Sequence, residues 1–590
     1  MYSNIRGVQI LISFLKEYGI HDVVIAPGGS NIPIIHSIEN DSYFNCYSVI
    51  DERSMVYFAL GISQEKNIPV ACICTSGTAV SNFLPGITEA FYQNVPIVAI
   101  TADKNPYFLE QLETQKIRQN NLFNNVCKKC VDLPLIENKD DEWLFGRLIN
   151  EALLSLSHNG YGPVQINIPI VGNVTNFTEK NLPKVKKIDI VNKLSNSIEW
   201  GKYSEKLYKA SKILCIIGQN ICFSERINNK MEEFFKHFNL VYAVEHMSNY
   251  SGIGAVYSYP LTETSRDHMN KILLPEIVIS FGNNISSYEM KSFLRNNSSS
   301  IEHWVIDESG RIRDTYQSLT ALFECTIDDF IENIINHNAN TRNLKIHSYY
   351  DLWRKAIKSV VFPVFEYSSI YIAQLLASVI PENSVLHLAI LSSTRVMQFF
   401  PLKTGVKTYS NIGALGIDGC LSSFIGQACS SSNLAFCLIG DLSFFYDMNA
   451  VSIKHLKKNA RIILLNNGGA TEFHLMMGRD KIPSINKYIA VDNKRIAKGW
   501  IESLGLTYYS VQNAEDAEKI IPMLAQQSDR PVFVEVFTDK EKDAQIIKEF
   551  YNENYPITLK STVKTVAEKV LPDKQYDQLI GIYKKIINDK

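Results

Sequence analysis

Two short polar segments in the last third of the sequence carry residue types that bind a metal ion and phosphate. Gly440 and Asp441 follow the apolar run LAFCLI, and Asn466 and Asn467 end the run RIILLNN about 25 residues later. A carboxylate, an amide oxygen and a backbone carbonyl suit Mg²⁺ held jointly with phosphates. A glycine before a helix also lets a phosphate approach unpaired N–H groups. These segments predict a diphosphate and metal site; the alternative is two ordinary turns that carry Asp and Asn.

A glutamate near the N-terminus is the second candidate for chemistry. The spacing of Asp441 and Asn467 resembles the diphosphate-binding signature of thiamine diphosphate (ThDP) enzymes. Such enzymes also need a glutamate from a separate domain, which hydrogen-bonds the aminopyrimidine ring of the cofactor. Glu52 fits this role, because it lies at the end of a strand-like run and before the helical run SMVYFALGISQ. The alternative is a glutamate that only stabilises a helix N-terminus.

Buried parallel strands, each followed by a helix, are expected to position these residues. Short β-branched runs recur along the chain and end in small or polar residues, which is typical of α/β units. They fall into three sets separated by polar segments. We therefore expect an α/β protein with three doubly wound parallel-sheet domains and a helical tail. The expected limits are 1–175 (pyrimidine-binding), 195–335 (central), 350–540 (diphosphate-binding) and 541–590 (tail).

Composition narrows the class of protein. The chain has 590 residues, of which 46% are hydrophobic and 20% charged, so wholesale disorder is excluded. A net charge of −2 gives no basic excess for nucleic acid. No apolar run approaches the roughly 20 residues that span a membrane, and the N-terminus lacks a signal-peptide pattern, which favours the cytoplasm. The 11 cysteines are expected to be free thiols, and the lone pair Cys127 and Cys130 is a poor zinc candidate.

Seven stretches of the sequence resemble one family of ThDP enzymes, the 2-succinyl-5-enolpyruvyl-6-hydroxy-3-cyclohexene-1-carboxylate (SEPHCHC) synthases of menaquinone biosynthesis. These stretches are IAPGGSNIPI, DERSMVYFALGIS, CICTSGTAVSNFLPGITEA, ITADKNP, QKIRQNNLF, SNIGALGIDG and GDLSFFYDMNAV. The resemblance covers nearly the whole chain and implies ThDP and Mg²⁺ as cofactors. It also implies a homodimer or homotetramer with active sites between subunits, so that Glu52 and Asp441 of one site come from different chains.

The resemblance assigns roles to individual residues. Glu52 corresponds to the activator of the pyrimidine ring. Ile417 corresponds to the apolar wedge that bends the cofactor; ordinary core packing is the alternative. The other assignments are Thr75 to Thr78 and Gln115 on loops that face the cofactor, Gly440 and Ser443 near the diphosphate, and Asp441, Asn467 and the Gly469 carbonyl on the metal.

The substrate side departs from the family pattern. SEPHCHC synthases bind two anionic substrates, 2-oxoglutarate and isochorismate, for which the planar arginine fork is the natural partner. Only Arg395 stands at a matching place. The family's other cationic positions read Ser30, Lys104 and Ile412 and, by a looser alignment, Tyr288 and Glu289. Because several cations with one role are missing, the sequence predicts a changed substrate.

A second departure follows Asn467. The family has an apolar Ile-Phe pair over the thiazolium, whereas this chain has Glu472 and Phe473. Glu472 is a candidate catalytic residue that donates or relays a proton after decarboxylation, if burial favours its protonated form. The alternative is a solvent-facing helix glutamate. His474 is a weaker candidate.

The sequence therefore predicts a ThDP- and Mg²⁺-dependent enzyme that decarboxylates a 2-oxo acid. The product carbon is then protonated, or joined to a carbonyl or alkene acceptor. Lys104 and Arg395 are candidate anchors for carboxylates, and Ser30 and Phe473 are further candidates for substrate contact. Two alternatives remain: SEPHCHC synthase activity itself, and a non-catalytic binding protein with a ThDP fold.

Overall fold

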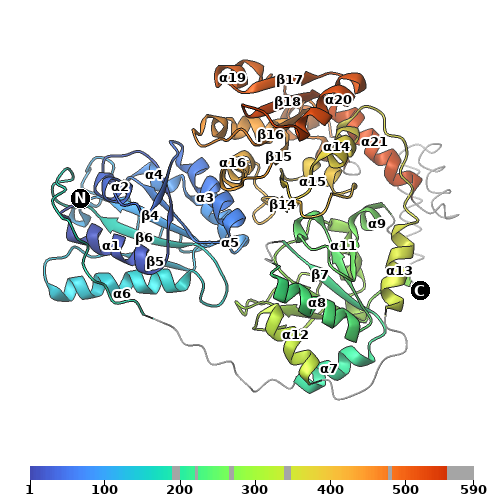
Figure 1. The fold of residues 1–590 in the computed structure, drawn as a ribbon, viewed down its shortest axis with the longest axis horizontal. Helices are drawn as coiled ribbons and strands as arrows, with labels where there is room; N and C mark the ends of the chain where they lie inside the picture. Colours follow the sequence, from blue (N-terminus) through green and yellow to red (C-terminus); the bar gives the residue numbers. More distant parts are fainter. Residues whose placement is uncertain (189–199, 220–222, 265–271, 338–346, 476–481, 555–590) are drawn as a thin grey trace.

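The structure is a computed structural model that describes residues 1–188, 200–219, 223–264, 272–337, 347–475 and 482–554 (Figure 1). Within these residues the strands form three six-stranded sheets, and every strand pair is parallel. Crossover segments, most of them helical, connect successive strands, as parallel pairing requires. The expected fold class, three doubly wound parallel-sheet units, is confirmed.

The first sheet has the strand order β2-β1-β3-β4-β6-β5 and forms the blue lobe of Figure 1. Its strands are β1 (Asp22–Ile25), β2 (Asn45–Ser48), β3 (Val70–Cys74), β4 (Ile97–Asp103), β5 (Lys129–Asp132) and β6 (Val164–Pro169). The accompanying helices are α1 (Arg6–Glu17), α2 (Ile32–Glu39), α3 (Glu52–Lys66), α4 (Thr78–Ser81), α5 (Leu84–Tyr92) and α6 (Lys139–Ser155). Strands β3 and β4 are buried throughout, which explains their continuous apolar runs.

The second sheet has the order β12-β11-β10-β7-β8-β9 and forms the green lobe. Its strands are β7 (Ile213–Ile217), β8 (Leu240–Val244), β9 (Ala255–Tyr257), β10 (Ile277–Phe281), β11 (Glu302–Ile306) and β12 (Leu319–Phe323). Its helices are α7 (Trp200–Lys209), α8 (Glu225–His237), α9 (Tyr259–Thr264), α11 (Tyr288–Asn296), α12 (Ile327–Asn336) and α13 (Ser348–Ile357). A separate hydrophobic cluster covers each face of this sheet.

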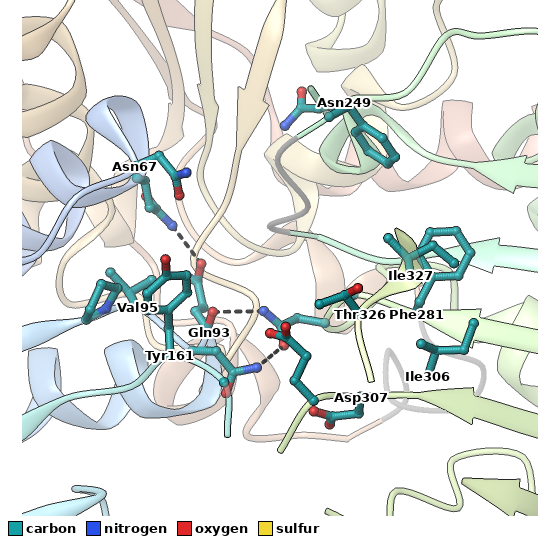
Figure 2. A pocket seen from close by; sticks show the side chains of 18 of the residues that line it. Asn67, Gln93, Val95, Tyr161, Asn249, Phe281, Ile306, Asp307, Thr326 and Ile327 are labelled. Carbon is teal, nitrogen blue, oxygen red and sulfur yellow. Dashed lines mark hydrogen bonds between the residues drawn. The ribbon is translucent and has the colours of Figure 1, made fainter. Parts of the chain in front are cut away.

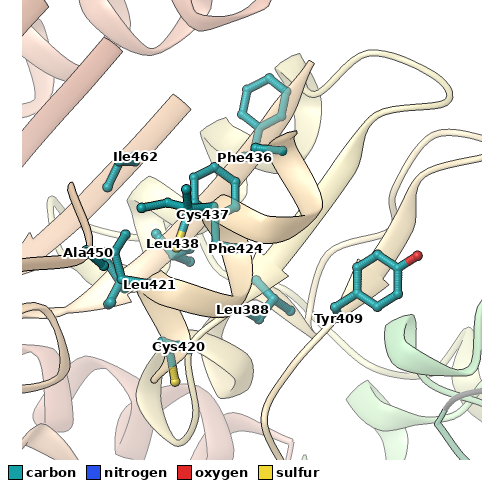
Figure 3. Packing of buried hydrophobic residues seen from close by; sticks show 14 of the residues in the cluster. Leu388, Tyr409, Cys420, Leu421, Phe424, Phe436, Cys437, Leu438, Ala450 and Ile462 are labelled. Atoms are coloured by element: carbon teal, nitrogen blue, oxygen red, sulfur yellow. The ribbon is translucent and has the colours of Figure 1, made fainter. Parts of the chain in front are cut away.

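The third sheet has the order β14-β13-β15-β16-β18-β17, which repeats the strand-order pattern of the first. Its strands are β13 (Val385–Leu388), β14 (Lys407–Tyr409), β15 (Ala435–Gly440), β16 (Ala460–Asn466), β17 (Thr507–Val511) and β18 (Val532–Phe537). Its helices are α14 (Ser369–Val379), α15 (Ser392–Met397), α16 (Cys420–Ser430), α17 (Asp441–Tyr446), α18 (Thr471–Leu475), α19 (Lys498–Ser503), α20 (Ala514–Ile520) and α21 (Lys540–Glu553). Figure 3 shows Leu421 and Phe424 of α16 packed in the core of this unit beside Phe436 and Leu438 of β15.

Helices α3 and α16 join the first and third units at very short range. A Cβ atom on Gly61 of α3 would lie 2.0 Å from the carbonyl oxygen of Ser423, and one on Gly426 of α16 would lie 2.1 Å from that of Phe58. Only glycine fits at either position. The two helix backbones therefore touch, and one hydrophobic cluster runs from the first unit into the third.

The domain limits expected from the sequence stay a prediction. The three sheets fall inside the three expected ranges, but the limit at 195 and the tail from 555 onward lie outside the described residues. Among the described residues no helix has the length and apolar character needed to cross a bilayer.

Candidate active site

Asp441 begins α17 at the carboxyl end of β15 and is only 2% exposed. Its Oδ1 accepts the Leu442 N–H at 2.7 Å, and its Oδ2 accepts the Asn493 side-chain amide at 2.9 Å. Burial raises the pKa of Asp441, while these donors and the N–H groups of Gly468 and Gly469 oppose the rise. The carboxylate thus lies in a buried place that is surrounded by donors.

Asn467 follows β16, which pairs with β15 in the third sheet. Its side-chain nitrogen donates to Thr471 Oγ1 at 2.7 Å and to Asp543 Oδ2 at 3.3 Å, so the amide oxygen faces away from these two side chains. Gly469 has a φ of +139°, and a Cβ atom there would lie 2.5 Å from the carbonyl oxygen of Ala490. The tight loop after Asn467 therefore needs glycine at this position.

The donor set at this edge fits a divalent cation with a diphosphate. Asp441, Asn467 and Gly469 follow two neighbouring strands, and they offer a carboxylate, an amide oxygen and a carbonyl oxygen, the hard ligands that Mg²⁺ takes. A Cβ atom on Gly440 would meet nothing within 4 Å, so the space beside its α-carbon is open. The three candidate ligands are thus brought to one edge, as the sequence predicted; their binding of metal stays a prediction.

Ile417 and Ser443 lie beside this edge. The Ser443 hydroxyl donates to the Ile417 carbonyl oxygen at 2.8 Å, which ties the loop before α16 to α17. Ile417 is partly buried and packs against the hydrophobic cluster shared by the first and third units. This packing agrees with the core role, and the wedge role stays a prediction.

Glu52 is the first residue of α3, at the carboxyl edge of the first sheet. Asp51 caps this helix by accepting the N–H groups of Arg53 at 3.0 Å and Ser54 at 3.2 Å. Burial raises the pKa of Glu52. Burial, and then the charge of Glu52, raises the pKa of Cys74 at the end of β3, so the carboxylate lies close to that strand end.

Three loops of the first unit meet near the same edge. Ser30 Oγ lies 3.3 Å from Ser76 Oγ, and the Gln115 side-chain amide donates to the Ser76 carbonyl at 2.8 Å. Thr78 starts α4 in the same loop and is exposed. The structure therefore brings Ser30 and Gln115 together with the loop that carries Thr78.

The start of α3 also contacts the third unit. Ser54 Oγ donates to Asp447 at 3.3 Å, and the Tyr57 hydroxyl donates to Asp418, next to Ile417, at 3.1 Å. The elements that carry Glu52, Ile417 and Asp441 thus adjoin within a single chain.

Whether one active site uses residues of two chains stays a prediction about the assembly. Residues 189–199, in the connection between the first two units, lie outside the described residues. We call Glu52, Ile417, Asp441, Asn467 and Gly469 the cofactor region.

The two candidate carboxylate anchors are already paired with carboxylates of the chain. Lys104 Nζ lies 3.0 Å from Glu113 Oε1. Arg395 on α15 donates through Nη2 to Glu472 Oε1 at 2.7 Å and through Nε to Glu472 Oε2 at 3.3 Å. Glu472 is 3% exposed, so the interpretation as a solvent-facing helix glutamate is wrong. Phe473 follows it on α18, and His474 Nε2 lies 3.0 Å from Asn486 Oδ1.

Two further residues complete this group and were not foreseen from the sequence. Arg395 Nη1 donates to Glu263 Oε2 at 3.4 Å and to the Tyr551 hydroxyl at 3.0 Å. Glu263 lies on α9 of the central unit and Tyr551 on α21. We call Arg395, Glu472, Glu263 and Tyr551 the Arg395 cluster. No sequence signal marks Glu263, which stands among polar residues in the run SYPLTETSRD.

A cavity of about 570 Å³ lies elsewhere, between the first and central units (Figure 2). Its lining includes Gln93 and Tyr161 on one side and Phe281 and Asp307 on the other. The Asn283 side chain bridges the two units by donating to the Gln93 carbonyl at 2.8 Å. None of the residues of the cofactor region or the Arg395 cluster lines this cavity.

Comparison with known proteins places the chain among enzymes that use ThDP. Residues 5–122, which carry Glu52 and Gln115, match the N-terminal TPP binding domain of thiamine pyrophosphate enzymes. Together with the three sheets and the cofactor region, this match defines a ThDP-dependent enzyme, whose cofactors are ThDP and a divalent metal ion.

The relatives narrow this class. The chain is 37% identical over 566 residues to the SEPHCHC synthase of Bacteroides thetaiotaomicron, covering 94% of this chain and 99% of the relative. It is 37% identical over 563 residues to that of Phocaeicola vulgatus, with the same coverage. It is 29% identical over 566 residues to that of Flavobacterium johnsoniae, covering 94% of this chain and all of the relative. The chain belongs to the SEPHCHC synthase family.

Proposed function

We propose that the protein is a ThDP- and Mg²⁺-dependent decarboxylase or carboligase that acts on a 2-oxo acid other than the donor of its named relatives. One observation supports a changed substrate. The two candidate anchors for substrate carboxylates, Lys104 and Arg395, each form an ion pair with a carboxylate of the chain itself. Membership of the family and the donor set around Asp441 support the cofactor chemistry.

When bound, ThDP supplies the electron sink that lets a 2-oxo acid lose CO₂. The residues of the chain would position the cofactor and polarise its reacting groups. Asp441, Asn467 and Gly469 would hold the metal and, through it, the diphosphate. Glu52 would hold a proton between its carboxyl group and the pyrimidine ring, a role suited to a carboxyl group whose pKa burial raises. Ile417 would set the cofactor's bend by its bulk.

The assembly and the setting are part of this proposal. We propose a homodimer or homotetramer with active sites between subunits, working in the cytoplasm without nucleic acid or membrane. The free thiols among the described cysteines support a reducing compartment. The acceptor, if the reaction is a carboligation, is a carbonyl or an alkene.

The test is a screen for CO₂ release from small 2-oxo acids with ThDP and Mg²⁺, with and without aldehyde acceptors. We expect at least one donor to be decarboxylated, and Glu52→Gln to lower turnover by about 10²–10⁴-fold, the usual contribution of a positioned acid–base group. Turnover of that donor unchanged by Glu52→Gln would overturn the catalytic assignment. Absence of CO₂ release from every donor would favour the non-catalytic alternative.

SEPHCHC synthase activity is the second candidate, and the 37% identity over 94% of the chain favours it. The assay is product formation from 2-oxoglutarate plus isochorismate. Robust formation of the family's product would overturn the changed substrate and leave the cofactor assignments intact.

A further inference from the structure

All three nitrogens of the Arg395 guanidinium group donate to groups of the chain itself. The Arg395 side chain is 13% exposed, and those of its partners Glu472 and Glu263 are 3% and 4% exposed. Glu472 takes Nη2 and Nε in a bidentate pair, while Nη1 donates to Glu263 and to Tyr551. Each nitrogen of the fork therefore has a partner, and both oxygens of Glu472 are used as acceptors.

The surroundings of the pair add negative rather than positive charge. The Glu289 N–H donates to Glu263 Oε1 at 3.4 Å, which places the start of α11 against the cluster. Burial, and then the charge of Glu472, raises the pKa of Tyr288, so this phenol also lies near the pair. Lys291 is the nearby cation on α11, but its ammonium donates to Asn284 at 2.7 Å and lies 5.8 Å from the Tyr288 ring centroid. Two buried glutamates thus pair with one guanidinium group, and burial together with the charge of a third, Glu289, raises the pKa of Glu263.

The cluster adjoins the cofactor region. Glu472 follows Thr471, whose hydroxyl accepts the side-chain amide of Asn467, a candidate metal ligand, at 2.7 Å. Asp543 of α21 accepts from the same amide, and Tyr551 of the same helix accepts from Arg395. The pair between Arg395 and Glu472 is therefore built into the loop that follows Asn467.

These contacts determine how well a second carboxylate on a substrate could bind to Arg395. To reach Arg395 it would have to displace Glu472, which would leave a buried carboxylate without its partner. Otherwise it would add a further negative charge to a guanidinium group that two carboxylates already neutralise. Both routes disfavour a dianionic donor, whereas an uncharged side chain meets neither obstacle.

We propose that Glu472 forms with Arg395 the ion pair that a substrate carboxylate would otherwise form. The donor is therefore a 2-oxo acid with an uncharged side chain. Glu472 is then a specificity-determining residue. This inference rests on the proposed function, since it names the substrate class of the same site.

The experiment compares matched donors with the holoenzyme. 2-Oxoglutarate and its 5-methyl ester have the same carbon chain and differ by one charge and one methyl group, and neither closes to a lactam. We expect kcat/KM for CO₂ release to favour the ester by about 10-fold or more. Glu472→Gln is expected to raise the ratio of kcat/KM for 2-oxoglutarate to that for the ester by about 10-fold, mainly through the KM for 2-oxoglutarate. An equal or higher wild-type kcat/KM for 2-oxoglutarate would overturn the inference.

Controls separate a specificity effect from a folding effect and from failure of the proposed function. Glu515→Gln, an exposed glutamate on α20, is expected to leave both donors unchanged. Glu263→Gln is a second variant that also frees part of the fork, in case Glu472→Gln does not fold. Calorimetric titration of wild type and variant with 2-oxoglutarate needs no turnover. Tighter binding to the variant supports the inference even if no donor is decarboxylated, and equal binding contradicts it.

Discussion

The cofactor region and the Arg395 cluster use the same residue types in opposite ways. In the cofactor region a buried carboxylate, Asp441, is surrounded by N–H donors and lies beside open space at Gly440. In the Arg395 cluster a buried cation is surrounded by carboxylates and a phenol of the chain itself. The first arrangement suits an incoming cation and diphosphate, whereas in the second two carboxylates of the chain pair with a single cation. One chain therefore combines a region that keeps open space beside a buried carboxylate with a region that pairs its buried cation internally.

The largest expected effect tests the cofactor side of this comparison. Asp441→Ala removes the candidate carboxylate ligand, and because a metal ion supplies several kcal/mol of charge stabilisation, turnover should fall by about 10³-fold or more with every donor. ThDP and Mg²⁺ binding, measured by calorimetry, should be lost in parallel. Asp516→Ala, near the start of α20, is the matched control. If Asp441→Ala still bound ThDP and Mg²⁺, the assignment of Asp441 as a metal ligand would be contradicted.

The next effect tests the other side. Arg395→Met leaves two buried carboxylates without their cation and should lower the free energy of unfolding by about 3–5 kcal/mol. Lys104→Met removes a more exposed pair, 28% and 39% exposed, and should change it by about 1 kcal/mol or less. Urea unfolding followed by fluorescence measures both. Equal effects of the two substitutions would show that the Arg395 cluster is not the buried group described above.

A smaller effect concerns the contact between the two sheets that carry the cofactor region. Gly61→Ala would place a Cβ atom 2.0 Å from the Ser423 carbonyl and force α3 away from α16. We expect a loss of about 1–3 kcal/mol in stability, as for other overpacked sites. Gly201→Ala on α7, where a Cβ atom meets nothing within 4 Å, should show no loss. If both variants unfold at the same urea concentration, the backbone contact of the two helices is wrong.

The last prediction is a pH dependence of stability at the same contact. Burial raises the pKa of Asp447 to about 7, although Ser422, Arg53 and Ser54 oppose the rise. Between about pH 4 and 7 the folded protein thus holds a proton that the unfolded chain has released, so stability from this group falls as pH rises, by at most about 1.4 kcal/mol per pH unit, and levels off above about pH 7. Asp447→Asn should flatten this part of the stability profile. An unchanged slope in the variant would contradict the assignment.

Local sequence patterns predicted the three sheets and the positions of the candidate cofactor-binding residues at the sheet edges. Buried parallel strands are continuous apolar runs, so β15 and β16 were visible in the sequence, and a residue that follows such a run must lie at the carboxyl edge. Glu52, Asp441 and Asn467 were found in this way. Each of these residues closely follows a strand, so a local sequence pattern is enough to locate it.

The Arg395 cluster could not be predicted, because its members have no local relation. Glu472 is 77 positions from Arg395, and Glu263 and Tyr551 are 132 and 156 positions away. Nothing in a single sequence indicates that these side chains meet. The sequence did indicate that cations were missing from the substrate side, but it presented Arg395 as a free anchor, whereas the structure pairs it. Likewise Tyr551 was assigned only to a tail.

Helix α21 reaches both regions at once. Its Lys540 N–H donates to the Asn467 carbonyl at 2.8 Å, its Asp543 accepts from the Asn467 side chain, and its Tyr551 accepts from Arg395. A protease that cut within this helix would release the loop after Asn467 and the guanidinium group of Arg395 together. Bound cofactor should therefore slow such a cut, and the rate of cleavage in α21 becomes a measure of site occupancy that requires no knowledge of the substrate.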